Sequence, residues 1–168
     1  MAHAHDSKQQ RKATVGWLTV SDTRTRADDL SGDLAERLLT EAGHRVRRGI
    51  EKDEPNDVRR QVDAWLADDA VELIVTSGGT GISARDRTYE ALAGRFEQQL
   101  DGFGELFRML SWEQVGSKAM FSRATAGVIR MKPIFLLPGS SKAVELALTK
   151  LILPEIPHLL RELEKHQP

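Results

Sequence analysis

A glycine-rich loop with two hydroxyl side chains is the clearest chemical motif of this sequence. It reads Ser77-Gly78-Gly79-Thr80-Gly81 and directly follows the apolar run 71–76. Glycines let a backbone approach a ligand closely and adopt positive φ, so that successive N–H groups converge on an anion. The alternative is a tight turn between a strand and a helix, for which two glycines suffice. Three glycines with two hydroxyls favour a phosphate site.

Two established phosphate-binding fingerprints are absent from the chain. The sequence has neither the Gly-x-Gly-x-x-Gly pattern of dinucleotide-binding folds nor the Walker spacing that ends in Gly-Lys-Ser/Thr. A generic nicotinamide-dependent dehydrogenase and a P-loop nucleotide hydrolase are therefore both disfavoured.

Two carboxylates are candidates for work on phosphate. Asp86 lies shortly after the glycine loop, where it is either an exposed acid in the first turn of a helix or a ligand of Mg²⁺, which takes one or two carboxylates plus phosphate oxygens. The residues alone leave both interpretations open. Asp53 lies within the acidic stretch 51–57, for which a solvated loop is the plainer interpretation.

Polar residues also follow two other apolar runs. Ser21 and Asp22 come after residues 15–20, and the turn Pro138-Gly139-Ser140 comes after residues 133–137. Ser140 precedes a helical pattern, so it either caps that helix or belongs to an anion site at its N-terminus. Ligands bind beyond the carboxyl ends of strands in an open parallel sheet, so these loops are expected to meet.

The element pattern that must position these residues is an alternation of strands and helices. Strands are predicted at 15–20, 45–50, 71–76 and 133–137, and helices at 31–42 with Ser31 as N-cap, from Asn56 onward, after residue 141 and at 156–164. This order predicts an α/β fold of three layers, with a mostly parallel, Rossmann-like central sheet and helices on both faces. The long stretch 77–131 is expected to hold the site loop and extra helices that wall a pocket.

Size, charge and cysteine content limit the classes of protein. The chain has 168 residues, 24 basic and 25 acidic, a net charge of −1 and no cysteine. This predicts one domain (13–168) behind a flexible tail (1–12), and neither a nucleic-acid partner nor a membrane partner, since no apolar run reaches about 20 residues. Without cysteine, disulfides are excluded, and the cytoplasm is the expected location.

Several of these motifs occur together in one known family. The pieces are Leu18-Thr19-Val20-Ser21-Asp22, Asp29-Leu30-Ser31-Gly32, the glycine loop, Arg85-Asp86, Gly102-Phe103-Gly104-Glu105, Ser122-Arg123 and Leu137-Pro138-Gly139-Ser140. In this order, over about residues 15–153, the chain resembles the MoaB/MogA family of molybdenum cofactor biosynthesis.

The resemblance implies a function and a set of site residues. Catalytic members of the family use Mg²⁺ and ATP to transfer AMP to the terminal phosphate of molybdopterin, releasing pyrophosphate, and form trimers or hexamers. By motif, residues 77–81 with Ser21 and Asp22 would bind phosphate, Asp86 would handle Mg²⁺, and Asp53 would be the second acid. The molybdopterin pocket would be lined by Glu105, Ser111, Pro138, Gly139 and Ser140. Other proteins of the pathway are possible partners.

The branch of the family leaves two hypotheses open. Residues 107–116 and 139–143 resemble MoaB more than MogA, and some bacterial MoaB-type proteins have the fold without an established catalytic role. The chain is thus either a molybdopterin adenylyltransferase or a non-catalytic molybdopterin-binding or assembly protein. Asp53 and Asp86 together favour the enzyme. Basic residues such as Arg108, Arg123 and Lys142 suit an anionic ligand, although each is more often a surface charge.

Overall fold

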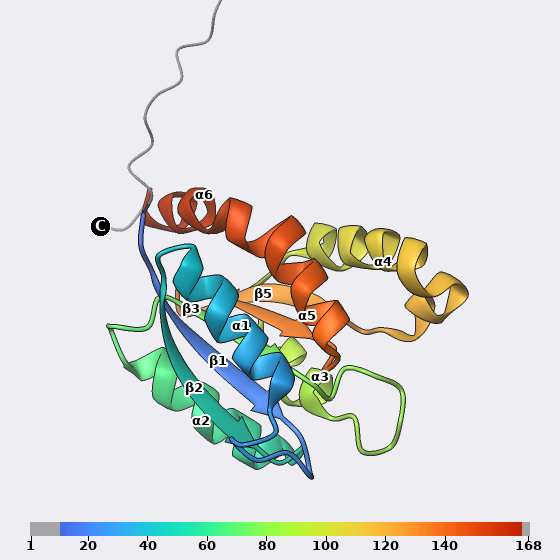
Figure 1. Cartoon of the computed structure of the whole chain (residues 1–168). Coiled ribbons are helices and arrows are strands. Elements are labelled where there is room, and N and C mark those ends of the chain that lie inside the picture. Colours follow the sequence, from blue (N-terminus) through green and yellow to red (C-terminus); the bar gives the residue numbers. More distant parts are fainter. Residues whose placement is uncertain (1–10, 166–168) are drawn as a thin grey trace, which may run out of the picture.

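The computed structural model describes residues 11–165. Its centre is a six-stranded sheet with the strand order β2-β1-β3-β6-β5-β4 (Figure 1). The strands are β1 (Thr14–Val20), β2 (Arg45–Glu51), β3 (Leu73–Ser77), β4 (Gln98–Gln99), β5 (Thr125–Ile129) and β6 (Lys132–Leu137). Strands β2, β1, β3 and β6 pair in parallel, and β5 and β4 extend the sheet antiparallel. The predicted α/β fold with a mostly parallel sheet is confirmed.

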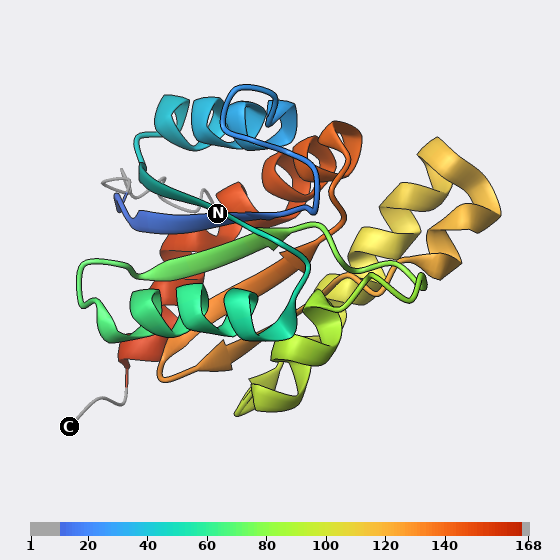
Figure 2. The ribbon, with the colours of Figure 1, turned by 90° about the horizontal axis from the view of Figure 1, so that it is seen from below.

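Helices cover both faces of this sheet. They are α1 (Leu30–Glu41), α2 (Pro55–Ala67), α3 (Thr88–Leu92), α4 (Asp101–Val115), α5 (Ser141–Ala147) and α6 (Leu153–Glu164), with shorter turns η1 (Ala93–Arg95), η2 (Gly116–Phe121) and η3 (Leu148–Ile152). In Figure 2 the sheet is seen between α1 on one side and α2 on the other. No helix among residues 11–165 is long and apolar enough to cross a membrane.

Alternating side chains of the strands fill two separate cores. Along β1, Val15 and Trp17 pack with α1, α4, α5 and α6, whereas Leu18 and Val20 pack with α2 and α3. This period of two is the geometry of a strand buried on both faces. It explains why β3 and β6 read as continuous apolar runs in the sequence.

The antiparallel part of the sheet is a correction to the prediction. The stretch 77–131 was expected to add only helices, but it also contributes β4 and the fully buried β5. The turn from β5 to β6 consists of Arg130 and Met131, both at positive φ (48° and 63°). Hairpin turns of this kind usually carry Asn or Gly, so the sequence holds no turn signal at this point.

Helix ends also differ from the predicted ones. The N-cap of α1 is Asp29 rather than Ser31, because the Asp29 carboxylate accepts the N–H of Gly32 at 3.1 Å. Helix α2 begins at Pro55 without a side-chain cap, not at Asn56. The two expected C-terminal pieces are consecutive: a π turn at η3, in which Leu153 N–H donates to the carbonyl five residues earlier, leads directly into α6.

The chain ends and one histidine complete the corrections. Of the predicted tail, residues 1–10 lie outside the described part, while Arg11 forms ion pairs with Glu72 and Glu164. His44 follows the end of α1, a position where a histidine is typically solvated. It is buried instead, and its Nδ1 accepts the N–H of Ala13 at 3.1 Å. Burial lowers the pKa of this imidazole.

Candidate functional site

The polar loops predicted from the sequence meet at the carboxyl ends of the parallel strands (Figure 1). Gly78 N–H donates to the Leu137 carbonyl at 2.9 Å, and a Cβ on Gly139 would stand 3.4 Å from the Gly78 Cα. The loop after β3 therefore packs directly against the loop after β6. Ser77 Oγ adds a contact to the Pro138 carbonyl at 3.4 Å.

Two glycines of the loop are required by conformation and by space. Gly78 and Gly79 have φ of 108° and 71°, a region that side-chain-bearing residues rarely adopt. A Cβ on Gly78 would lie 2.1 Å from the Val20 carbonyl oxygen. A Cβ on Gly79 would lie 2.2 Å from Thr88 Oγ1 and 2.6 Å from Asp53 Oδ2. The glycine loop is thus pressed against β1 on one side and an acid on the other.

Asp53 is the acid at the centre of this arrangement. It is only 6% exposed, and its Oδ1 accepts the N–H of Arg87 at 3.0 Å. Its own N–H donates to Asp22 at 3.1 Å. Burial raises the pKa of Asp53, the Arg87 N–H opposes that shift, and the charges of Asp86 and Asp22 raise it further. Three strand-end loops thus converge on one buried carboxylate.

Asp86 belongs to the segment that follows the glycine loop. Its Oδ2 accepts the N–H of Ser83 at 2.9 Å and lies 2.7 Å from where a Cβ of Gly81 would stand. The side chain borders a hollow of about 380 Å³ whose walls come from Ile82, Ser83, Ala84, Asp86, Arg87, Glu90 and Arg123. The acid is therefore open to this hollow and close to the loop.

An arginine bridges the same loops from outside. Arg85 donates two hydrogen bonds to Asp22, at 3.0 and 2.9 Å, and one to Glu54 at 3.0 Å. These bonds hold the pKa of Asp22 below its usual value. Sequence reasoning did not predict this bridge, since its only signal was that Arg85 neighbours Asp86.

The oxygen atoms gathered here fit a hard divalent cation. Among residues 11–165 no group of three or more His, Cys, Asp or Glu side chains is placed to hold a metal. Asp53 and Asp86 supply two carboxylates, and Thr88 Oγ1, which stands with Asp53 against Gly79, is buried without a hydrogen-bond partner. Mg²⁺ commonly takes one or two carboxylates and completes its shell with water and phosphate oxygens. These two carboxylates and one hydroxyl therefore fit the coordination preference of Mg²⁺.

Other predicted phosphate and pterin residues have structural roles as well. Ser140 caps α5, its Oγ accepting the Ala143 N–H at 3.2 Å. Ser21 Oγ accepts the N–H groups of Thr23 and Arg24 and so shapes the turn after β1. Arg24 in turn donates to the Gly139 carbonyl at 3.1 Å, which ties this turn to the loop after β6.

Two predicted pterin residues lie on α4 and not on a strand-end loop. Glu105 and Ser111 are on α4, Glu105 exposed and Ser111 buried. Within residues 11–165 no side-chain hydrogen bond joins either of them to the loops after β1, β2, β3 or β6. Their roles toward molybdopterin stay predictions.

The basic residues expected to suit an anion are differently employed. Arg108 donates to the Ala124 carbonyl at 2.9 Å, and Arg123 donates to the carbonyls of Gly81 and Asp86. Lys142 is exposed at the start of α5. Two of the three guanidinium and ammonium groups therefore support loops and do not stand free.

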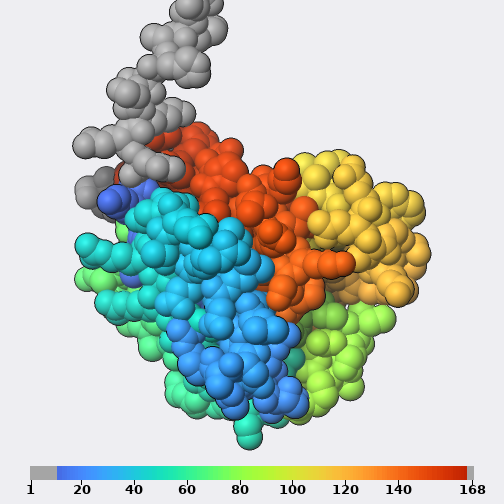
Figure 3. All heavy atoms as spheres, viewed as in Figure 1, coloured from blue at the N-terminus to red at the C-terminus, as the bar shows by residue number. Residues whose placement is uncertain are grey.

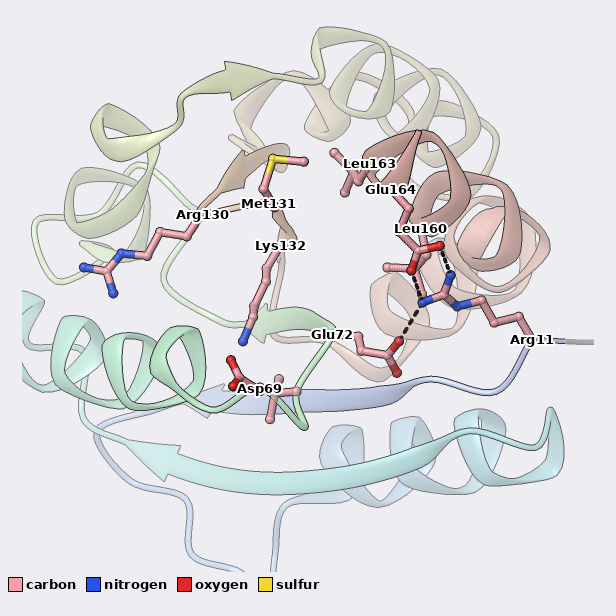
Figure 4. A pocket seen from close by; sticks show the side chains of 10 residues that line it. Arg11, Asp69, Glu72, Arg130, Met131, Lys132, Leu160, Leu163 and Glu164 are labelled. Atoms are coloured by element: carbon pink, nitrogen blue, oxygen red, sulfur yellow. Dashed lines mark hydrogen bonds and ion pairs between the residues drawn. The ribbon is translucent and has the colours of Figure 1, made fainter. Parts of the chain in front are cut away.

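A second hollow, of about 280 Å³, lies at the opposite edge of the sheet (Figure 4). Its lining comes from residues before β1 and β3, from the turn before β6 and the first residue of β6, and from the C-terminal part of α6. Arg11 Nη2 pairs with Glu72 at 2.8 Å and Glu164 at 2.6 Å, as the dashed lines show. Lys132 Nζ donates to the carbonyls of Trp65 and Asp68. Arg11, Glu72, Glu164 and Lys132 thus already have protein partners, so the strand-end site is the better candidate.

Comparison with known proteins shows the family of this chain. A family model described as "Probable molybdopterin binding domain" matches residues 16–158. Molybdenum cofactor biosynthesis protein B of Bacillus subtilis is 50% identical over 150 residues, 88% of each chain. The Staphylococcus carnosus protein of the same name is 46% identical over 162 residues, covering 94% of this chain and 95% of the relative.

Solved structures agree with the sequence matches. A crystal structure of a molybdenum cofactor biosynthesis protein B has a TM-score of 0.89 at 46% identity and covers 92% of this chain and 98% of its own. The tungsten cofactor synthesizing protein MoaB from Pyrococcus furiosus has a TM-score of 0.84 at 35% identity, covering 92% and 99%. A MogA structure matches at 29% identity with a TM-score of 0.78, covering 89% and 99%. The chain therefore belongs to the MoaB/MogA family of molybdenum cofactor biosynthesis proteins, and is more similar to the MoaB branch.

Proposed function

We propose that this chain binds molybdopterin and adenylylates it with ATP. In this reaction an oxygen of the terminal phosphate of molybdopterin attacks the α-phosphorus of ATP. The bond from that phosphorus to the oxygen bridging the α- and β-phosphates breaks, and pyrophosphate leaves. Membership in a family of cofactor biosynthesis proteins supports the substrate, and the strand-end site supports the chemistry.

One observation carries the proposal more than any other. The buried Asp53 carboxylate lies against Gly79 and accepts a hydrogen bond from the N–H of Arg87, the residue after Asp86. The negative charge of Asp86 contributes to the raised pKa of Asp53. Nucleotidyl transfer depends on positioning and on electrostatic stabilisation more than on a covalent nucleophile. Two acids fixed against a phosphate-sized glycine loop are suited to that task.

Each residue of the site has a role in this proposal. Mg²⁺, held by Asp53 and Asp86, would neutralise phosphate charge. The backbone N–H groups of residues 79–81 would bind phosphate oxygens, since glycine permits their close approach. Arg85 offers a guanidinium that exchanges its carboxylate partners for phosphate, a pairing that arginine favours. Ser140 and Gly139 stand at the neighbouring loop for the pterin phosphate.

Self-association belongs to the same proposal. Large apolar side chains on α4 and η2 form an exposed patch, here named the α4–η2 apolar face: Leu106, Met109, Trp112, Val115, Met120 and Phe121. In Figure 3 this part of the chain forms the right-hand side of the molecule, above the segment that carries the site loop. Six half-exposed side chains present on the order of 500 Å² of apolar surface. That suits the centre of an interface of about 800 Å² per partner, and we infer a homotrimer or hexamer.

Calorimetric titration separates the two hypotheses for this family. An adenylyltransferase binds ATP in the presence of Mg²⁺ and produces pyrophosphate when molybdopterin is added. A carrier binds molybdopterin but shows no heat with ATP and Mg²⁺. The Asp86→Asn variant should lose the nucleotide heat, while the matched variant Asp69→Asn, an exposed acid at the opposite edge of the sheet, should retain it. Molybdopterin binding without any nucleotide binding in the folded wild type would leave only the carrier.

A further inference from the structure

Arg123 reaches the site loop from the segment just before β5. Its backbone N–H donates to the Thr80 carbonyl at 2.9 Å. Its Nε donates to the Gly81 carbonyl at 2.9 Å, and its Nη2 to the Asp86 carbonyl at 3.0 Å. One arginine therefore bonds the backbone on both sides of residues 82–85, the excursion that ends in the proposed metal ligand.

The guanidinium is itself fixed from α3. Glu90 accepts hydrogen bonds from both terminal nitrogens of Arg123, one of them at 3.3 Å. The Arg123 Cζ lies 5.0 Å from the centre of the Tyr89 ring, within the range of a cation–π contact. The hydrogen bond from Arg123 also lowers the pKa of Glu90. A carboxylate, a ring and two carbonyls thus fix one side chain.

Four of the five N–H donors of the Arg123 guanidinium are thus bonded to protein groups. With Nε, Nη1 and Nη2 all bonded, Arg123 is a brace of the backbone. The carbonyl that it holds at Asp86 adjoins the N–H of Arg87, which donates to Asp53 at 3.0 Å. The position of the brace therefore sets where one acid stands relative to the other.

We propose that Arg123 is a positioning residue, which holds the segment 81–86 so that Asp86 faces Asp53 and the glycine loop. This inference rests on the proposed function for its catalytic consequence. An arginine is needed because its planar fork offers five donors at fixed angles, whereas a lysine offers one ammonium on a flexible chain. Lys at this place could reach one carbonyl but could not bridge two and a carboxylate.

The test compares Arg123→Lys and Glu90→Gln with the wild type. Arg59→Lys is the matched control, because Arg59 Nε donates to a backbone carbonyl in α3, at Ala91 (3.0 Å), and not to residues 81–86. Amide hydrogen exchange reports the order of residues 82–87. In Arg123→Lys it should rise about tenfold, in Glu90→Gln by less, and in Arg59→Lys not at all.

The kinetic readout separates positioning from ligand contact. A misplaced acid should lower kcat on the order of 100-fold with little change in KM for ATP. An unchanged kcat and unchanged exchange in Arg123→Lys would overturn the proposal. So would a raised KM with unchanged kcat, because that result means that Arg123 binds the nucleotide directly.

The inference is separable from the adenylylation proposal. If the wild type transfers no AMP, the proposed function fails, and the brace is then judged by exchange and by the affinity for inorganic pyrophosphate with Mg²⁺. The brace predicts faster exchange and weaker pyrophosphate binding in both Arg123→Lys and Glu90→Gln. Wild-type values for the two variants would overturn it whatever the enzyme does.

Discussion

The backbone of Gly79 is confined by Thr88 on one side and by Asp53 on the other. Gly79→Ala should lower the free energy of unfolding, because a left-handed backbone costs about 1–2 kcal/mol for an alanine and the new methyl must displace a buried group. Binding of ATP with Mg²⁺ should be lost with it. Urea unfolding and calorimetry measure the two effects.

Gly94→Ala is the control for that variant. Gly94 has nothing within 4 Å of the added Cβ and no positive φ. It should unfold and bind nucleotide as the wild type does. Equal behaviour of the two alanine variants would contradict the packing described around Gly79.

Asp53 has a pKa raised by burial and by the charge of Asp86. The fold therefore favours the protonated form of Asp53. The resulting stabilisation is complete at pH values below the pKa that Asp53 has in the unfolded chain, and it is lost as the pH rises through the pKa that Asp53 has in the folded protein. Mg²⁺ binds the ionised carboxylate, so binding of ATP with Mg²⁺ should weaken as the pH falls. The midpoint of this loss should lie above about 3.9, the pKa of a free aspartate. NMR titration of the Asp53 carboxyl carbon measures this directly.

The Asp86→Asn variant sharpens the test. Removing one neighbouring charge should lower the pKa of Asp53 toward the free value, while Asp69→Asn should leave it in place. If the titration midpoint of Asp53 is the same in the wild type, Asp86→Asn and Asp69→Asn, the carboxylates of Asp53 and Asp86 do not interact.

The two candidate acids could be predicted from the sequence, whereas the arginine contacts around them could not. Asp86 stands out because it closely follows the glycine loop, and Asp53 because the family resemblance implies a second acid there. The bonds of Arg123 run to backbone carbonyls of residues 81 and 86. A carbonyl has no signature in the sequence, so such a brace emerges only from coordinates.

Ser140, at the start of α5, has an observed structural role as N-cap and a predicted role as a ligand of the pterin phosphate. Its Oγ caps the helix, so Ser140→Ala should lose about 1 kcal/mol of stability with or without ligand. Ser140→Asn keeps a good cap and should restore that stability. Thermal unfolding and molybdopterin titration of both variants separate the roles.

The outcome for Ser140 depends on the asparagine variant. If the hydroxyl contacts the pterin phosphate, affinity falls in both variants although Asn restores stability. If Asn restores affinity together with stability, Ser140 only caps α5, and the predicted ligand role is wrong.

Strands with a clear apolar run could be predicted from the sequence, and strands β4 and β5 could not. Strands β1, β3 and β6 are buried on both faces, so their apolar runs are plain. Strand β5 was missed because the turn before β6 is Arg130-Met131, and β4 because two glutamines carry no pattern. The cap at Asp29 and the start of α2 at Pro55 differ from the predicted helix starts by only one or two residues, which changes no packing face.

The α4–η2 apolar face is a property of the whole molecule and of its assembly. Trp112 is 62% exposed. The Trp112→Ser variant should therefore change the free energy of unfolding of the single chain by less than about 0.5 kcal/mol. It should nevertheless shift the oligomer toward monomer, because aromatic anchors dominate interfaces. Sedimentation velocity over a range of concentrations measures the change.

Leu30→Ser is the matched control for self-association. Leu30 is 70% exposed and lies at the start of α1, outside the face. It should leave the oligomer intact. A wild type that sediments as a monomer at every concentration would remove self-association from the proposal.

The central claim is that the loops at the strand ends carry out AMP transfer. The most direct measurement follows [α-³²P]ATP, Mg²⁺ and molybdopterin in a single turnover, with label counted in adenylylated molybdopterin. The wild type and Asp69→Asn should both form labelled product with equal release of pyrophosphate, and folded, oligomeric Asp86→Asn should form none. Absence of labelled product from folded wild-type protein, or full product from Asp86→Asn, would contradict the assignment.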